Sequence, residues 1–406
     1  MIGMLIKQER LVQRMSQSTL CQNICTTSYL SKIENGNATC SNEIYEQLLE
    51  KLKIEYISDD SLCNQMELEF NDILSILRTQ GYCYFEDLEN PISPLCEKMR
   101  YSNQCMKALL LCTLVKFYRT DSEISQKEID SFENMIPNFD EGERLLFFYM
   151  KTTFLRNKGD INGAIQMLRI IESAKEPWTY QGIGFYLCIT ASYQQAIEKY
   201  QLAYNSYAKI GAVKGMLDTA LCLLVVYCNR IQLEEMLRWS AIIEQINLVV
   251  NNNEIKCSVP YNLGSTYLVC GEIQQAISYL SECEKLLVLE GTKYFENITY
   301  MKLAFSYAII GEREQAKMMI DKTNVHNMTD YWLLTLDLIH YIIRTPNYLR
   351  MPDYSKLLEG CLEASKKEFA KSFSRFYVIY LFEAYKAQRQ YKKATMLLEE
   401  YKFFLI

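Results

Sequence analysis

The sequence after residue 150 repeats itself, and this repetition constrains the fold more than any other feature of the chain. The segment 261–280, YNLGSTYLVCGEIQQAISYL, places Gly264, Gly271 and Ala276 among large apolar residues at helical spacing. The segment 303–320, LAFSYAIIGEREQAKMMI, has small residues at the same three relative positions. Small residues at these positions let two antiparallel helices approach closely. The pattern therefore predicts a stack of helical hairpins.

An alanine, or the residue that substitutes for it, marks the repeat along the chain. The marker position is occupied by Ala164, Ala196, Met236, Ala276, Ala316 and Ala394. The last gap is about two periods, so we expect a degenerate unit over 331–365. The pattern is that of the tetratricopeptide repeat, with a period near 40 that implies helices longer than those of the standard unit of about 34 residues. We therefore predict an all-α chain with a tetratricopeptide-like α-solenoid over residues 62–406.

Composition agrees with a helical fold and argues against several functions. Glycine (15) and proline (7) are scarce, which disfavours a turn-rich β fold. The formal net charge of −6 argues against nucleic-acid binding along the whole chain, so any such contact must be local. The 15 cysteines include no Cys-x-x-Cys pair, and only two histidines occur, so we expect reduced thiols, no metal and no cofactor. We find no catalytic constellation or glycine-rich phosphate loop, and we do not expect an enzyme.

The chain shows no pattern for secretion or for a membrane span. Its first residues, MIGMLIKQERLVQRM, have a charge at position 7 and no apolar run long enough for a signal peptide. No stretch approaches the roughly 18 uncharged apolar residues that a membrane helix needs. We therefore expect a cytoplasmic protein that does not bind a membrane.

The first 58 residues differ from the repeats because their predicted helices are short and their connections tight. Leu5, Ile6, Arg10 and Leu11 lie at helical spacing, and Ser16 is typical of the N-cap of a second helix. We expect four helices, over 3–14, 17–24, 27–34 and 42–53. The turn between the second and third is short enough for a helix-turn-helix.

The third predicted helix carries polar residues on one face. Thr27, Ser28 and Lys32 share that face, whereas Leu30 and Ile33 lie on the opposite one. Short hydroxyl side chains at the start of a helix can reach base edges in a major groove, and a lysine one turn later can reach a guanine edge or a phosphate. The predicted contacts with a double-stranded DNA operator are Gln17 (to a phosphate), Thr26, Thr27, Ser28, Tyr29 and Lys32. The alternative is that these are solvated faces of an ordinary bundle.

The segment 16–36, SQSTLCQNICTTSYLSKIENG, resembles the Xre/Cro-type helix-turn-helix. Its usual form is Thr-Gln-x-x-Leu-Ala, then Ser-x-x-x-Ile-Ser-x-Ile-Glu-x-Gly, and the matching residues are Gln17, Leu20, Ser31, Ile33, Glu34 and Gly36. Cys25 departs from the pattern, because glycine and valine are common there. The form C-x-x-S-Y-L-S-K-I-E-N resembles the peptide-sensing regulators of Gram-positive bacteria of the Rgg, NprR, PlcR and PrgX type (the RRNPP family). This resemblance implies a DNA-binding domain over 1–58 and a repeat domain for peptide sensing and dimerisation over 62–406. Glu34 is expected to be structural.

A solenoid has a concave face that is lined by the first helix of each hairpin and suits an extended peptide. Side chains that donate and accept hydrogen bonds can hold a peptide backbone there. The predicted peptide contacts are Asn262, Asn229, Gln181, Ser265, Tyr261 and Lys302. The resemblance supports Asn262 specifically and Asn229 weakly, because asparagines on such helices bind the peptide backbone in that family. For the tyrosines, packing between repeats is the alternative.

Two functional hypotheses follow. The first is a homodimeric transcription regulator that reads an operator and responds to a short signalling peptide, as in quorum sensing. The second is a repeat-protein scaffold that binds and inhibits a protein partner such as a kinase or response regulator. The amphipathic C-terminal segment, YKKATMLLEEYKFFLI, either caps the last repeat or contributes to dimerisation.

Overall fold

The computed structural model describes residues 2–81, 94–119, 124–291, 295–324, 328–368 and 371–405. Within these ranges the regular elements are helices, with one isolated β-bridge between Ile57 and Ser102, so the all-α prediction is confirmed. None of the helices in this part of the chain is both long and apolar enough to cross a bilayer. The chain divides into two compact units, Met1–Gly182 and Ile183–Ile406. This division differs from the predicted domain boundary near residue 60, which stays a prediction.

The first unit begins with a bundle of four short helices. These are α1 (Ile2–Val12), α2 (Gln17–Cys21), α3 (Thr27–Glu34) and α4 (Asn42–Lys51). The predicted end of the second helix at residue 24 is wrong, because Asn23 adopts a left-handed φ of 64°. The Lys51 ammonium also contacts the Thr19 and Leu20 carbonyls, at 3.4 and 3.3 Å, as a cation does at a helix C-terminus. The connection to α3 therefore spans residues 22–26 and is longer than predicted.

Six further helices, most of them longer, follow in the described part of the first unit. They are α5 (Asp60–Gln80), α6 (Leu95–Lys98), α7 (Cys105–Arg119), α8 (Gln126–Glu133), α9 (Glu141–Asn157) and α10 (Ile161–Ile171). The bundle joins them through the Ile57 amide, which donates to the Tyr101 carbonyl at 3.0 Å, and through the Tyr101 hydroxyl, which donates to Glu9 at 2.7 Å.

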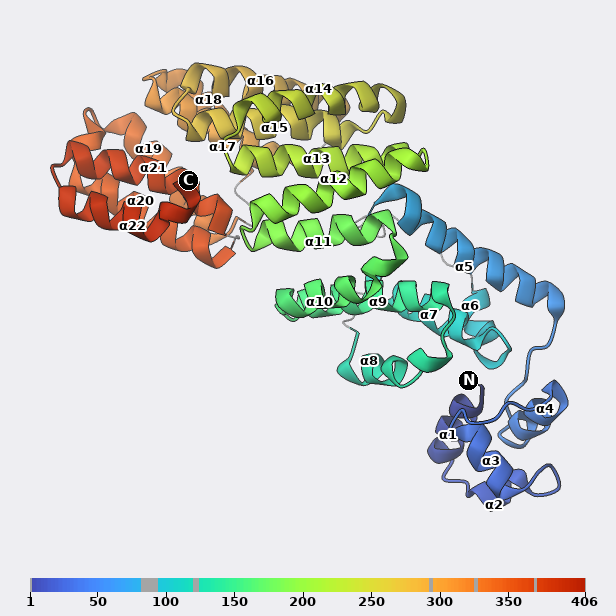
Figure 1. Cartoon of the computed structure of the whole chain (residues 1–406). Helices are drawn as coiled ribbons and strands as arrows, with labels where there is room; N and C mark the ends of the chain where they lie inside the picture. Colours follow the sequence, from blue (N-terminus) through green and yellow to red (C-terminus); the bar gives the residue numbers. More distant parts are fainter. Residues whose placement is uncertain are drawn as a thin grey trace. The chain divides into compact units, whose positions relative to one another are not determined.

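The second unit is a row of helical hairpins that lie side by side in Figure 1. Helix α11 (Pro177–Ile189) crosses the division between the units and pairs with α12 (Tyr193–Lys209). The following helices are α13 (Val213–Asn229), α14 (Leu233–Val250), α15 (Asn253–Val269), α16 (Ile273–Glu290), α17 (Glu296–Ile309), α18 (Arg313–Lys322), α19 (Asp330–Arg344), α20 (Pro352–Glu368), α21 (Lys371–Ala387) and α22 (Tyr391–Leu405). Helices α19 and α20 fill the gap where a degenerate unit was predicted.

The marker residues pack between the helices of their hairpins, as predicted. Each lies early in a second helix, and each is buried: Ala164, Ala196, Met236, Ala276 and Ala316 are 0% exposed, and Ala394 is 3% exposed. A larger side chain at an alanine position would push the paired helices apart. The repeat that was read from the sequence is therefore the packing repeat of the structure.

Helix α22 packs through Ala394, Leu397 and Tyr401, which are buried. The side chains of its last four apolar residues, 403–406, lie outside the described residues. The two predicted roles of this end, capping of the last repeat and dimerisation, both stay predictions.

The turn within each hairpin contains one residue in the left-handed region. Three hairpins have Gly159, Gly271 or Gly311 there, three have Ala191, Ile231 or Arg389, and the α19–α20 hairpin has Asn347, with φ between 53° and 85°. The left-handed conformation costs an L-residue roughly 1–2 kcal/mol and glycine very little. The turns with Ala191, Ile231 or Arg389 therefore hold a strained residue.

Gly271→Ala should lower the free energy of unfolding by about 1 kcal/mol. An added Cβ meets nothing within 4 Å, so the loss comes from the backbone alone. Arg389→Gly, at an exposed residue of the equivalent turn, is the matched variant and should raise the free energy of unfolding by up to about 1 kcal/mol. Urea unfolding of both variants measures these free energies. Changes of the same sign in the two variants would contradict the assignment of strain to the left-handed turn residues.

Candidate DNA-contacting and peptide-binding surfaces

Helix α3 begins where the sequence predicted, and a side chain caps it. The Thr26 hydroxyl accepts from the Tyr29 amide at 3.2 Å, as the Ser16 hydroxyl does from the Thr19 amide at 3.0 Å for α2. Leu30 and Ile33 are buried. The predicted polar residues Thr26, Thr27, Ser28 and Lys32 are exposed, and Tyr29 is half-buried with its hydroxyl donating to the Thr39 carbonyl at 2.9 Å. The predicted DNA-contacting face of α3 is therefore exposed to solvent.

A buried ion pair fixes α3 against α1. Arg10 donates to Glu34 through Nε at 2.6 Å and Nη2 at 2.8 Å, and its Nη1 donates to the Met15 carbonyl at 2.9 Å. Glu34 is 0% exposed and Arg10 7%, so the expected structural role of Glu34 is confirmed. The sequence placed Arg10 at helical spacing with Leu5, Ile6 and Leu11 but indicated neither its burial nor its partner. Leu11 of the same predicted stripe is 58% exposed, because Arg10 takes the inward position.

Gln17 joins this ion pair. Its amide nitrogen donates to Glu34 Oε2 at 2.7 Å. In this arrangement the donor that was predicted to reach a phosphate is already used within the fold. We therefore assign Gln17 first to the support of α3 and keep a direct phosphate contact only as a prediction.

The charges of the pair are stable at neutral pH. Burial by itself would raise the pKa of Glu34, but hydrogen bonds from Arg10 and Gln17 outweigh burial and lower it. The hydrogen bond to Glu34 raises the pKa of Arg10 although burial opposes it. Close helix packing supports the pair, because a Cβ on Gly3 would lie 2.1 Å from the Ile33 carbonyl oxygen. No pattern in the sequence indicated this contact.

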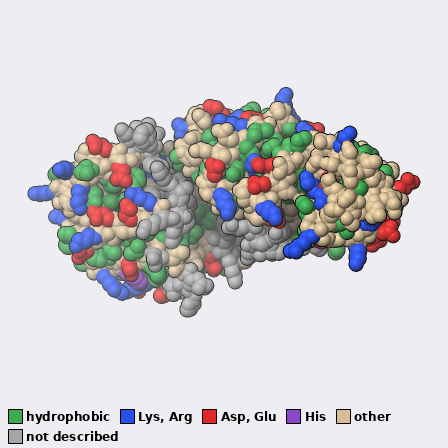
Figure 2. Space-filling view, turned by 90° about the horizontal axis from the view of Figure 1, so that it is seen from below, with side chains coloured by type: hydrophobic (Ala, Val, Ile, Leu, Met, Phe, Trp, Pro, Cys, Tyr) green, Lys and Arg blue, Asp and Glu red, His purple; other side chains and the backbone are tan. Residues whose placement is uncertain are grey.

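Little positive charge surrounds the exposed face of α3. Arg10 is buried, and Lys7 donates to Asn35 at 2.8 Å, which leaves Arg14 and Lys32 as the freely exposed cations before residue 40. In Figure 2 the part that carries the bundle, at the right of the view, shows mainly backbone and uncharged polar side chains with scattered Lys and Arg. Any DNA contact here must depend on short polar groups more than on charge.

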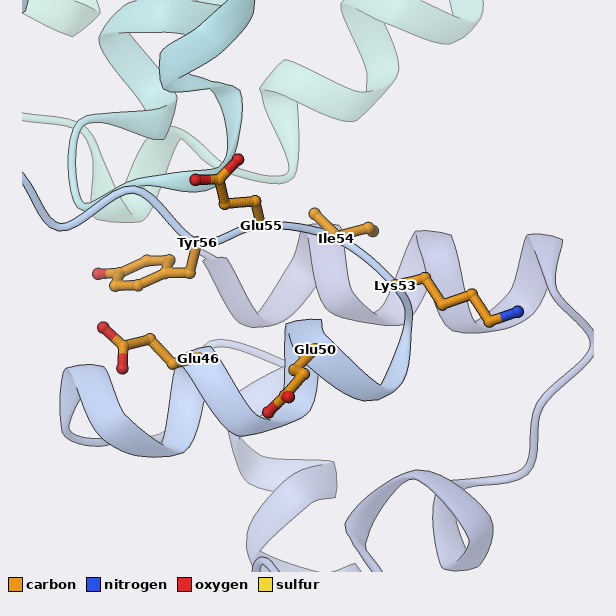
Figure 3. A pocket seen from close by; sticks show the side chains of 6 residues that line it. All are labelled: Glu46, Glu50, Lys53, Ile54, Glu55 and Tyr56. Carbon is orange, nitrogen blue, oxygen red and sulfur yellow. The ribbon is translucent and has the colours of Figure 1, made fainter.

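An open pocket of about 360 Å³ lies on another part of the bundle (Figure 3). Glu46 and Glu50 of α4 line it together with the segment Lys53–Tyr56, which contributes Glu55. Three carboxylates against one lysine repel phosphate. The pocket is therefore unsuited to DNA.

Three of the six predicted peptide contacts meet on neighbouring first helices of the second unit. Lys302 of α17 donates to the Tyr261 hydroxyl at 2.8 Å and to the Ser265 hydroxyl at 2.6 Å, both on α15. Its ammonium lies 4.2 Å from the centre of the Tyr261 ring, and Phe295 stacks on that ring at 4.8 Å. Burial lowers the pKa of Lys302 to about 7, although the nearby Cys283 acts in the opposite direction. Tyr261 is buried, which agrees with the alternative that the tyrosines pack between repeats. Its hydroxyl nevertheless accepts the hydrogen bond from Lys302.

The other three predicted contacts are not hydrogen-bonded to Lys302, which donates to Tyr261 and Ser265. Asn262 is half-buried on α15, and its amide nitrogen donates to the Ser258 carbonyl at 2.8 Å. Asn229 ends α13, and its carbonyl accepts from the Arg375 guanidinium of α21, a contact that the sequence did not indicate. Gln181 belongs to the first unit and is 2% exposed, so its predicted place on an open inner face is wrong and we leave it out of the proposed site.

No protein-family model matches the chain, and no curated protein matches it. Among solved structures, a Rap protein complexed with competence and sporulation factor is 11% identical, with a TM-score of 0.62 over 84% of this chain and 98% of that chain. RapI in its apo form is 10% identical, with a TM-score of 0.62 over 83% and 98%. The apo quorum sensor NprR from B. thuringiensis is 15% identical, with a TM-score of 0.61 over 84% and 99%. At these identities the likeness shows the fold.

The chain is a tetratricopeptide-like α-solenoid. Both its own helix order and its likeness to the Rap and NprR structures establish this architecture. The predicted solenoid is thus confirmed, whereas the Xre-type assignment of the N-terminal bundle stays a prediction.

Glu34→Ala should destabilise the N-terminal bundle by about 3–5 kcal/mol, because it leaves the Arg10 charge buried without its partner. Glu55→Ala, which removes an exposed carboxylate from the same bundle, is the control and should change stability by less than about 0.5 kcal/mol. Hydrogen exchange of residues 2–52 measures both effects. Equal protection in the two variants would show that the ion pair does not hold the bundle together.

The same pair predicts a pH dependence. Because the Glu34 pKa is lowered on folding, its stabilisation is present above the ordinary Glu range and is lost as the pH falls through the folded-state value. Exchange in the bundle should therefore accelerate in acid in the native protein. In Glu34→Gln this acid dependence should be weaker, and an unchanged profile would contradict the assignment.

Proposed function

We propose that this protein is a DNA-binding transcription regulator, controlled by a short signalling peptide in the concave groove of its repeat domain. The observation that carries the proposal is the exposed, capped start of α3, held in place by the buried Arg10–Glu34 pair. In this proposal Thr27 and Ser28 contact base edges and Lys32 contacts a guanine edge or a phosphate. Thr26 and Tyr29 contribute chiefly by supporting this end of the helix.

Dimerisation follows from the weak charge of the proposed reading surface. A single bundle with few exposed cations neutralises few phosphates and would bind DNA weakly. Two bundles on two half-sites would bind more tightly, so we propose a homodimer acting in the cytoplasm. The protein acts through binding and not as an enzyme.

The peptide part of the proposal is supported by the solenoid fold and by the polar cluster on α15 and α17. One solenoid of similar fold is complexed with competence and sporulation factor, and another is described as a quorum sensor. In the proposed site Asn262, Ser265, Tyr261 and Lys302 face the ligand. Asn229 is a weaker proposed contact through its side-chain amide, because Arg375 binds only its main-chain carbonyl.

Ser28→Ala combined with Lys32→Ala should weaken binding to the duplex upstream of the protein's own gene by about tenfold or more. Two polar groups of the proposed reading surface are lost, and loss of the lysine should also reduce the slope of log affinity against log salt by about 1. Fluorescence anisotropy over a salt series measures both quantities, and circular dichroism checks that helicity is unchanged.

Lys127→Ala is the matched control, because it removes one exposed charge from α8 of the same unit. It should leave affinity nearly unchanged. Equal affinity of the double variant and the native protein would refute α3 as the reading helix. If the native protein shows no salt-dependent binding at all, the scaffold hypothesis replaces the regulator.

A further inference from the structure

We propose that the cluster of Lys302, Tyr261 and Ser265 binds a carboxylate of the signalling peptide. This inference rests on the peptide-sensing function proposed above and adds the chemical group that is recognised. A carboxylate in a short peptide comes either from its free C-terminus or from an Asp or Glu side chain. The site recognises the group that both share.

The ammonium of Lys302 is bonded to neutral groups. An ammonium has three N–H donors, and the hydroxyl oxygens of Tyr261 and Ser265 accept two of them. The ring of Tyr261 adds a cation–π contact. These partners are neutral, so they orient the cation but do not neutralise it.

No carboxylate among the described residues forms an ion pair with Lys302. The carboxylates of adjoining helices have other partners: Glu290 pairs with Lys256 at 3.2 Å, Glu284 pairs with Lys322, and Glu296 accepts from the Tyr300 hydroxyl at 3.3 Å. Asp337 of α19 is exposed, and Cys283 of α16 is the titratable group that acts on Lys302. A half-buried cation without a counter-charge is costly, and an incoming carboxylate would relieve that cost.

Lys302 is half-buried on a first helix, α17, and its partner Ser265 and the neighbouring residue Asn262, both half-buried, lie on the preceding first helix, α15. First helices line the concave side of a solenoid, where an extended ligand binds. Asn262 could then bond the peptide backbone while Lys302 binds the charged group. The two contacts together would fix one position of the peptide along the groove.

The cluster also predicts how affinity depends on pH. Only protonated Lys302 attracts a carboxylate, and burial lowers the pKa of the unliganded side chain to about 7. Affinity for a carboxylate peptide should thus be highest below pH 7 and should fall by up to about tenfold per pH unit above it. Arginine stays protonated over this range, so Lys302→Arg should retain carboxylate binding and lose this dependence.

The test uses the full chain and three mixtures of synthetic heptapeptides randomised over uncharged residues. The first mixture has a free C-terminus, the second is amidated, and the third is amidated but contains one Glu. Affinity selection followed by mass spectrometry identifies the retained peptides, and calorimetry measures their Kd. We expect the best ligands to come from the first or third mixture, which distinguishes the two sources of carboxylate. Amidation or Glu→Gln substitution of those peptides should weaken binding at least tenfold.

Lys302→Gln should reduce that difference to less than twofold. Lys256→Gln is the matched control, because it changes a lysine of α15 that already has a carboxylate partner, and it should keep the difference. If Lys302→Gln does not fold, the pH series on Lys302→Arg decides, and the same pH dependence as in the native protein would overturn the inference. Equal binding of all three mixtures would overturn the carboxylate site while peptide sensing survives. Binding of none of them would refute peptide sensing itself, and the inference with it.

Discussion

The close approach of paired helices at small buried residues is the constraint on which the solenoid depends. Alanines such as Ala276 and Ala316 leave no gap between the two helices of a hairpin, and a left-handed residue in each turn brings the second helix back against the first. Because this geometry recurs, the first helices come to line one face. Residues about one repeat apart, such as Ser265 and Lys302, then become neighbours on that face, and this is how three polar side chains from α15 and α17 meet.

The N-terminal bundle depends on a different interaction, a buried charge pair. The bundle is too small for a large apolar core, and Arg10, Glu34 and Gln17 tie three helices together through one carboxylate. Loss of one partner leaves an unpaired buried charge, which is strongly destabilising, whereas the intact pair adds little net stability. The main effect of the pair is therefore to specify a single placement of α3. The exposed start of α3 owes its orientation to this network, and the proposed reading of DNA depends on it.

The sequence predicted the parts of this structure that are periodic. Marker residues, hairpins and the start of α3 followed from helical spacing and capping, because these are local properties. Contacts between distant residues were not predictable: the partner of Arg10, the approach of Gly3 to Ile33 and the contact of Arg375 with Asn229 each join positions that no local pattern relates. Gln181 was predicted on an open inner face but is buried. Helical periodicity shows which face of a helix a residue lies on, but not whether another part of the chain packs over that face. Tyr261, Ser265 and Lys302 were named as inner residues, but their mutual hydrogen bonds and the lowered pKa of Lys302 emerged only from the fold.

The central claim is that α3 reads duplex DNA, and selection from a randomised pool of DNA duplexes tests it most directly. The full chain is incubated with the pool at moderate salt, bound duplexes are amplified, and the cycle is repeated in parallel with the Ser28→Ala/Lys32→Ala variant. The account predicts that the native protein enriches a sequence with two related half-sites about 10 base pairs apart, or a multiple of this, and that the variant does not. Failure of the native protein to enrich any sequence, or enrichment of the same sequence by the variant, would contradict it.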